Sequence, residues 1–136
     1  MYPNTRIDKI SLINFKNHLN TNLKDLGSFV VLNGNNGSGK TNILEAISLF
    51  SPGRGIKNSR FVEMPNKDRD QKNFEIKINL KYDIGEVELF RSFSSVEKNK
   101  NYISVDNEKI TNFQLLEFIN ILWITPITVS YTHLTL

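Results

Sequence analysis

Hydrophobic residues in the first third of the chain predict three strands and a helix. Apolar residues dominate positions 9–15, and alternation over 19–24 predicts a second, half-exposed strand after a short turn. The unbroken run Phe29-Val30-Val31-Leu32 is typical of a parallel strand that is buried on both faces. Apolar residues then recur at helical spacing over 43–50, and Ser51-Pro52-Gly53 ends the helix.

The middle of the chain predicts an irregular segment followed by hairpins. Residues 53–73 are rich in Gly, Asn, Lys, Arg and Asp and show little periodicity. Apolar residues then occupy every second position over 74–82, and the pattern resumes over 87–93 after a turn. A shorter hairpin is predicted around 106–109. We therefore expect an antiparallel β lobe over residues 74–110.

The end of the chain predicts a helix, a strand and a tail. Thr111-Asn112-Phe113-Gln114 fits a capping box, and the apolar face of the helix that follows is formed by Leu115, Leu116, Ile119 and Leu122. Trp123-Ile124-Thr125 predicts another core strand, which Pro126 ends. Residues 127–136 are expected to be a truncated or non-native tail, because an uncharged stretch follows a sheet that looks unfinished.

A glycine-rich loop separates the apolar run at 29–32 from the helix that follows. It is a complete Walker A motif and predicts an ATP site: Gly34-Asn35-Asn36-Gly37-Ser38-Gly39-Lys40-Thr41. The three glycines permit backbone dihedrals that turn successive N–H groups toward a phosphate. Lys40 supplies a positive charge for the β- and γ-phosphates, and the Thr41 hydroxyl is placed to bind Mg²⁺. Strand, loop and helix occur in the required order, so we predict a Walker A unit over 9–52.

The distribution of charge suggests a second kind of partner. The net charge is +3, but residues 1–60 hold eight Lys and Arg against three Asp and Glu, and the remainder holds nine against eleven. The positive excess therefore surrounds the phosphate loop and favours a nucleotide or nucleic-acid partner, although such a charge is also common on solvated surfaces. The chain has no cysteine and no apolar stretch of membrane-spanning length, which favours a cytoplasmic protein without a membrane partner.

Four sequence blocks, in the family order, resemble the RecF family of ABC-type ATPases, which is related to the SMC proteins. They are Ile10-Ser11-Leu12-Ile13-Asn14-Phe15-Lys16-Asn17-His18, the loop and helix Asn36 to Ala46, Leu49-Phe50-Ser51-Pro52-Gly53-Arg54-Gly55, and Trp123-Ile124-Thr125-Pro126. The fold that this resemblance implies is α/β, the N-terminal lobe of a P-loop NTPase domain of the ABC-ATPase type with an antiparallel β subdomain, incomplete over residues 1–126.

The resemblance also implies functional roles. Gly34 to Thr41 would bind ATP and Mg²⁺, and the chain around Asn17 and His18 would lie near the nucleotide. A basic region available to DNA phosphates would include Arg54, Lys57 and Arg60. Members of the family are cytoplasmic, ATP-dependent DNA-binding proteins of replication and recombinational repair that act on single-stranded or gapped DNA. They dimerise around ATP, act with RecO and RecR to load RecA, and are tied to the SOS response.

Some family features do not occur in this chain. The Walker B carboxylates, the signature motif and the D-loop are missing, and Ile127-Thr128-Val129 departs from the family pattern. No catalytic residue is identified, and Glu45 is interpreted as a solvated or helix-pairing residue rather than a catalytic base. Two alternatives stay open: another SMC-like or OLD-type ATPase, and a nucleotide-binding module that does not hydrolyse ATP.

Overall fold

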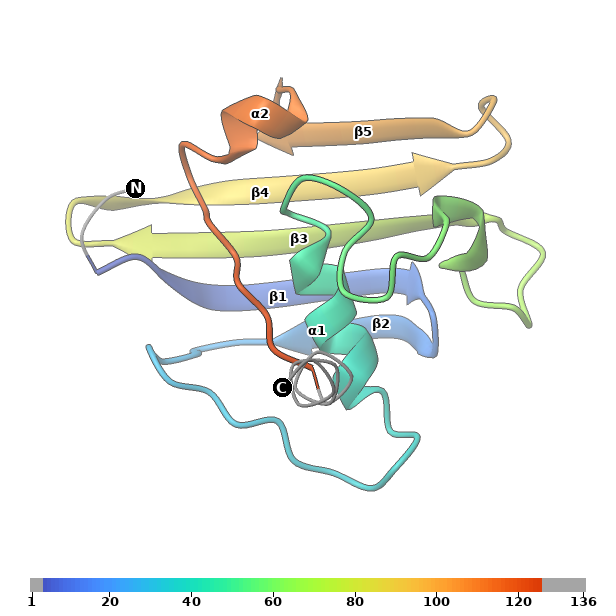
Figure 1. Cartoon of the computed structure of the whole chain (residues 1–136), viewed down its shortest axis with the longest axis horizontal. Helices are drawn as coiled ribbons and strands as arrows, with labels where there is room; N and C mark the ends of the chain where they lie inside the picture. Colours follow the sequence, from blue (N-terminus) through green and yellow to red (C-terminus); the bar gives the residue numbers. More distant parts are fainter. Residues whose placement is uncertain (1–3, 126–136) are drawn as a thin grey trace, which may run out of the picture.

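The protein, described here from a computed structural model over residues 4–125, is built on one antiparallel sheet (Figure 1). Its six strands lie in the order β2-β1-β3-β4-β5-β6. The strands are β1 (Arg6–Phe15), β2 (His18–Leu23), β3 (Asn73–Tyr82), β4 (Gly85–Ser94), β5 (Lys100–Val105) and β6 (Glu108–Lys109). The helical elements are α1 (Lys40–Ser48), the short 3₁₀ turn η1 (Phe61–Glu63) and α2 (Asn112–Leu115).

The pairing of β1 with β3 joins the two β regions that the sequence predicts. Ile10 lies opposite Ile78 and Leu12 lies opposite Ile76, so the strands at 9–24 and the lobe at 74–110 form a single sheet. The strands predicted in both regions are confirmed. They could be predicted because apolar and polar residues alternate locally along each of them. The phosphate loop and α1 therefore lie in the connection from β2 to β3, the two strands that flank β1 in one sheet.

The core lies between one face of this sheet and α1, which crosses that face in Figure 1. Alternate residues of the strands point inward and are buried, among them Leu12, Phe74, Ile76, Ile78, Leu80 and Leu89. The buried strand residues pack against Ile43 and Ala46 of α1 and against Leu49 and Phe50, which follow the helix. Phe50 is fully buried, which agrees with the helical periodicity predicted for 43–50.

A buried arginine connects the sheet to the end of the helix. Arg91 lies on the inward face of β4 and is 1% exposed. Its Nη1 donates a hydrogen bond of 2.7 Å to the carbonyl of Leu49, and its guanidinium lies 4.9 Å from the centre of the Phe61 ring. Burial lowers the pKa of Arg91 to about 10, so the side chain stays charged at neutral pH. A cation beside the last carbonyls of α1 complements the helix dipole.

The strand predicted at 29–32 is not formed. Residues 24–33 contain no strand, and Phe29 and Val31 are 87% and 71% exposed. A strand buried on both faces needs a neighbour at each edge, and β2 is the last strand on this side of the sheet within residues 4–125. Apolar composition indicates a tendency to be buried, but it does not supply the neighbouring strand.

The elements predicted after residue 110 are shorter than expected. The capping box is confirmed, because Gln114 N–H donates to Thr111 Oγ1 at 3.2 Å and Thr111 N–H donates to Gln114 Oε1 at 2.9 Å. However, α2 ends at Leu115, and the strand predicted at Trp123–Thr125 is absent. Leu122 is 99% exposed, so it belongs to no buried helix face.

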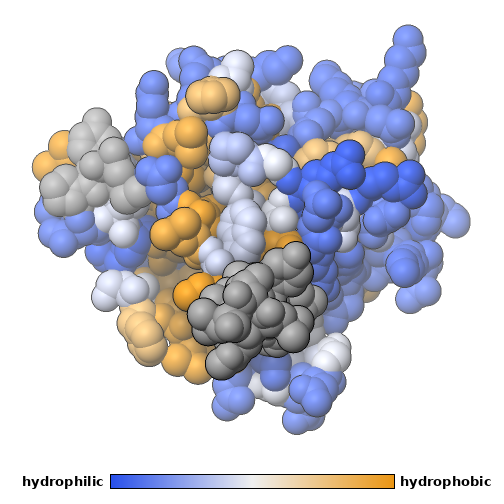
Figure 2. Space-filling view, in the orientation of Figure 1, coloured by the Kyte–Doolittle hydropathy of each residue, from blue (hydrophilic) through white to orange (hydrophobic). Residues whose placement is uncertain are grey.

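Exposed apolar residues therefore gather on one side of the molecule. Figure 2 shows them along the segment that descends from α2 and over the loop that follows β2, while hydrophilic side chains dominate the side formed by the segment after α1. Among residues 4–125, no helix has the length and apolar character needed to cross a membrane. The prediction of a non-native tail at 127–136 lies outside the described residues.

Candidate nucleotide-binding site

The Walker A loop turns into α1 through two glycines in left-handed conformations. Gly37 has a φ of 81° and Gly39 a φ of 96°, values that residues with a side chain rarely adopt. Gly39 is the N-cap of α1 and leaves the first N–H groups of the helix without a side-chain cap. The sequence also predicts a backbone conformation at Gly34 that only glycine adopts; this is wrong, because the φ of Gly34 is not positive. A Cβ at Gly34 would instead lie 2.9 Å from Ser38 Oγ.

The loop borders a hollow in which a phosphate group can be accommodated. This hollow has a volume of about 210 Å³ and is lined by Asn36, Gly37, Gly39, Lys40, Thr41 and Asn42. Lys40 Nζ is folded back to donate a hydrogen bond to the carbonyl of Gly34. Helix N–H groups, the positive end of the helix dipole and the Lys40 ammonium together form a site for an anion.

Two side chains hold the loop: Asn17 from the turn between β1 and β2, and His18, the first residue of β2. We call residues 16–18 together the β1–β2 turn. Asn17 Nδ2 donates to the carbonyl of Gly37 at 3.3 Å, and His18 Nε2 donates to the carbonyl of Gly39 at 2.9 Å. Because Nε2 faces a carbonyl, it carries the proton in the neutral imidazole, and Nδ1 accepts from the Thr21 hydroxyl at 2.8 Å. Asn17 and His18 thus lie against the loop, beside the hollow that its residues line.

The Gly39 carbonyl also accepts the first hydrogen bond of the helix, from Ile43 N–H at 3.1 Å. His18 therefore supports the residue at which loop and helix meet. A Cβ on Gly39 would lie 2.6 Å from Asn17 Oδ1, so the side chains from the β1–β2 turn leave room for glycine alone. Long-range contacts of this kind carry no periodic signal in the sequence.

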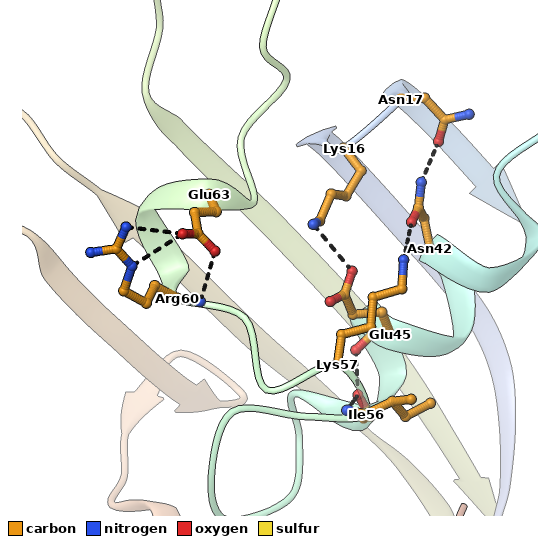
Figure 3. Close-up of polar contacts among 9 residues, drawn as sticks. Lys16, Asn17, Asn42, Glu45, Ile56, Lys57, Arg60 and Glu63 are labelled. Carbon is orange, nitrogen blue, oxygen red and sulfur yellow. Dashed lines mark hydrogen bonds and ion pairs between the residues drawn. The ribbon is translucent and has the colours of Figure 1, made fainter. Parts of the chain in front are cut away.

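Glu45 lies inside the molecule, so its interpretation as a solvated residue is wrong. Its side chain is 0% exposed, and its Oε1 lies 3.6 Å from Lys16 Nζ, again from the β1–β2 turn (Figure 3). Neither carboxylate oxygen accepts a hydrogen bond within the described part of the chain. The pairing of α1 with Lys16 is a third contact between the turn and the helix that carries the phosphate loop.

The three cations predicted to contact DNA have different surroundings. Arg54 is exposed and makes no hydrogen bond or ion pair with residues 4–125, whereas Lys57 Nζ donates to Asn42 Oδ1 at 3.3 Å. Arg60 binds Glu63, with Nη2 at 2.9 Å and Nε at 3.1 Å from the same carboxylate oxygen. This side-chain hydrogen bond lowers the pKa of Glu63. The structure therefore leaves only one of the three cations without an internal partner.

Mg²⁺ would enter this site with the nucleotide. Residues 4–125 contain no cluster of three His, Asp or Glu side chains that could hold an ion alone. The Thr41 side chain is exposed in the first turn of α1 and borders the hollow, which suits a hydroxyl that supplies one ligand while phosphates and water supply the others. The residues present fit a Mg²⁺–nucleotide complex.

Comparison with known proteins agrees with this geometry. Residues 6–126 match the sequence family described as the AAA ATPase domain. The chain belongs to this family. It is also 36% identical over 123 residues to the DNA replication and repair protein RecF of Rickettsia prowazekii and to that of Rickettsia felis. These matches cover 90% of this chain and 33% of each relative, so the chain spans about a third of the length of the curated relatives.

Solved structures give the same fold. The recombination mediator protein RecF with ATP, of the RecFOR pathway, superposes with a TM-score of 0.75 at 23% identity, covering 90% of this chain and 33% of that one. The SMC head domain from Thermotoga maritima reaches 0.58 at 17% identity, covering 82% and 41%. The expected fold class, a RecF- and SMC-like P-loop ATPase lobe with an antiparallel sheet, is confirmed, as is the resemblance to RecF.

Proposed function

We propose that this chain is the ATP-binding part of a RecF-like protein of DNA replication and recombinational repair. The observation that carries the proposal is the phosphate loop at the start of α1, with Lys40 and Thr41 beside a hollow and two loop carbonyls held from behind by Asn17 and His18. ATP would bind with its phosphates on residues 34–41, and Mg²⁺ would bind between the phosphates and Thr41.

Lys40 is the residue on which the test depends. Replacing it in Lys40→Ala removes the loop's side-chain cation, so the affinity for Mg²⁺–ATP should fall at least about a hundredfold, as expected for a charge-assisted contact of 3 kcal/mol. The measurement is a titration with a fluorescent ATP analogue displaced by ATP. The matched control is Lys109→Ala, which removes an equal charge from β6 at the far edge of the sheet. Equal affinity in wild type and Lys40→Ala would overturn the ATP-site proposal.

DNA is the second proposed partner, and Arg54 is its best-placed contact. Arg54 is exposed and has no hydrogen-bond or ion-pair partner among residues 4–125, so its guanidinium is available to backbone phosphates, whereas Lys57 and Arg60 are already engaged. Recognition would use backbone charge on single-stranded or gapped DNA, and also on duplex DNA, without reading bases. Losing one phosphate contact in Arg54→Ala should lower the slope of log affinity against log salt by about one. An unchanged slope would remove Arg54 from the DNA surface.

The remaining roles follow from the similarity to RecF. We propose a cytoplasmic protein that forms an ATP-dependent homodimer, works with RecO- and RecR-like partners to load RecA, and supports the SOS response. Another SMC-like or OLD-type ATPase is favoured less, because curated RecF relatives are 36% identical to this chain, whereas the SMC structures are similar to it at 17% and 23% identity. The measurement that tests assembly is light scattering with and without Mg²⁺–ATP on the full-length protein.

A further inference from the structure

Figure 3 shows a line of three polar side chains, Lys57, Asn42 and Asn17, joined by hydrogen bonds. Lys57 Nζ donates to Asn42 Oδ1 at 3.3 Å, and Asn42 Nδ2 donates to Asn17 Oδ1 at 2.9 Å. Asn17 Nδ2 then donates to the carbonyl of Gly37 at 3.3 Å. The line joins three separate parts of the chain: the segment after α1, the first turn of α1 and the β1–β2 turn. We call Lys57, Asn42 and Asn17 the amide relay.

The two ends of the amide relay fix the orientation of both amides. An ammonium group can only donate, so the atom of Asn42 that faces Lys57 must be oxygen, and its Nδ2 must face Asn17. The Gly37 carbonyl can only accept, so the atom of Asn17 that faces it must be Nδ2. Starting from either end gives the same arrangement. All three hydrogen bonds therefore point in one direction, from the Lys57 ammonium to the Gly37 carbonyl.

The carbonyl at the end of the amide relay belongs to a residue whose conformation matters for phosphate binding. Gly37 has a φ of 81° and lines the hollow. A phosphate loop works by turning its N–H groups toward the anion, which requires its carbonyls to point away and find other donors. Asn17 is such a donor for Gly37, and Asn42 and Lys57 prevent its amide from flipping.

We propose, on the basis of the ATP site argued above, that Asn17 and Asn42 are positioning residues of the phosphate loop and that Lys57 serves this site rather than a DNA surface. None of the three needs to touch the nucleotide. They act through the Gly37 carbonyl, by keeping the loop in the conformation that receives phosphate before the nucleotide arrives. The binding free energy is then not spent on ordering the loop.

The test measures Mg²⁺–ATP affinity in the full-length protein for Asn17→Leu, Asn42→Leu and Lys57→Met. Loss of one amide hydrogen bond should weaken binding about three- to tenfold for each asparagine variant, and loss of the ammonium about two- to fivefold. Asn42→Asp keeps an acceptor for Lys57 but has no donor for Asn17 and adds a negative charge beside the hollow, so it should bind Mg²⁺–ATP no more tightly than Asn42→Leu. Lys57→Arg keeps a donor and should restore wild-type affinity.

Lys109→Met is the matched control, because Lys109 carries the same charge but lies in β6, at the far edge of the sheet. It should leave the ATP affinity unchanged. The asparagine side chains are half-buried or exposed, so the midpoint of thermal unfolding without nucleotide should shift by less than about 3 °C. A purely structural role would lower that midpoint and the affinity together.

Non-additivity decides whether the residues act as one line. In the Asn42→Leu background, Lys57→Met should have no further effect on ATP affinity. Wild-type affinity in the asparagine variants, or equal losses in Lys57→Met and Lys109→Met, would overturn the amide relay while leaving the ATP site intact. If the wild-type protein bound no ATP, or Lys40→Ala bound it normally, the ATP site and the amide relay would both fall.

Discussion

Gly39→Ala tests how closely the β1–β2 turn packs against the phosphate loop. The φ of 96° at this position costs a residue with a side chain about 1–2 kcal/mol. In addition, a Cβ would lie 2.6 Å from Asn17 Oδ1 and also overlap His18 Nε2, so the hydrogen bonds from these side chains would be displaced. Loss of one or both of these bonds costs about 1 kcal/mol per bond. The total for Gly39→Ala is therefore about 2–4 kcal/mol.

This cost should appear as a loss of nucleotide affinity. The loop of the unliganded variant can relieve the strain by moving, and ATP must then restore the native conformation before it binds. Converted at about 1.4 kcal/mol per factor of ten, the cost corresponds to a Kd for Mg²⁺–ATP raised roughly thirtyfold to several-hundredfold. The assay is competition against a fluorescent nucleotide, with thermal unfolding measured in parallel.

Gly37→Ala is the matched control, since it keeps the conformational cost and removes the overlap. Gly37 has a φ of 81°, but nothing lies within 4 Å of a Cβ built there. Strain alone should raise the Kd about five- to thirtyfold. The His18→Ala background removes the imidazole that a Cβ on Gly39 would overlap. In that background, Gly39→Ala should raise the Kd by a factor closer to the one expected for Gly37→Ala. Equal Kd values for Gly37→Ala and Gly39→Ala in the wild-type background would refute the close packing of the turn against Gly39.

Three other substitutions test the charged residues around the loop. Glu63→Gln releases Arg60 from its carboxylate partner, so DNA affinity at low salt should rise and the salt slope should steepen by up to about one, as DNA titrations at several salt concentrations would show. Lys16→Met leaves the Glu45 side chain buried without its ion-pair partner and should lower the free energy of unfolding by about 3 kcal/mol. Glu45→Gln removes the buried charge itself and should lower it by less than half of that amount. Urea unfolding measures both. Arg91→Met removes the hydrogen bond to the Leu49 carbonyl and should destabilise the protein by about 1–3 kcal/mol. Because burial lowers the pKa of Arg91 to about 10, both folded and unfolded chains hold this proton below that pH. The destabilisation should therefore be constant from pH 5 to 9, and a change within that range would contradict the assignment.

The strands could be predicted because their signal is local. Phe74 to Tyr82 alternates in every position, and the structure places its apolar residues on the buried face of β3. The apolar run at 29–32 could not be assigned in this way. Whether such a run forms a buried strand depends on a neighbouring strand, which local sequence does not reveal. Likewise, the capping box at Thr111 predicts where α2 begins, but it does not predict that the helix ends at Leu115. The residue at which a helix or strand begins was therefore easier to predict than the elements that pack beside it.

In the candidate site, too, the local features could be predicted and the long-range contacts could not. Residues 34–41 form a contiguous motif, so the loop and its attachment to a helix could be predicted from the sequence alone. Asn17 and His18 lie about twenty positions away, and only the family resemblance placed them near the nucleotide. Asn42 and Glu45 carried no signal of their own, because an asparagine or a glutamate on a helix is usually solvated. Their contacts with Asn17 and Lys16 depend on how α1 lies across the sheet.

Both ends of α1 are attached to this sheet by polar side chains, and that explains how a short helix can hold a phosphate loop. At its start, Asn17 and His18 hold the carbonyls of Gly37 and Gly39. At its end, Arg91 holds the carbonyl of Leu49. A helix of nine residues is marginal in isolation, so its geometry comes from tertiary contacts rather than from helix propensity. The three anchors come from the β1–β2 turn and β4, which the continuous sheet fixes relative to one another. The conformation of the loop is therefore set by the sheet, through the hydrogen bonds that the carbonyls of Gly37 and Gly39 accept.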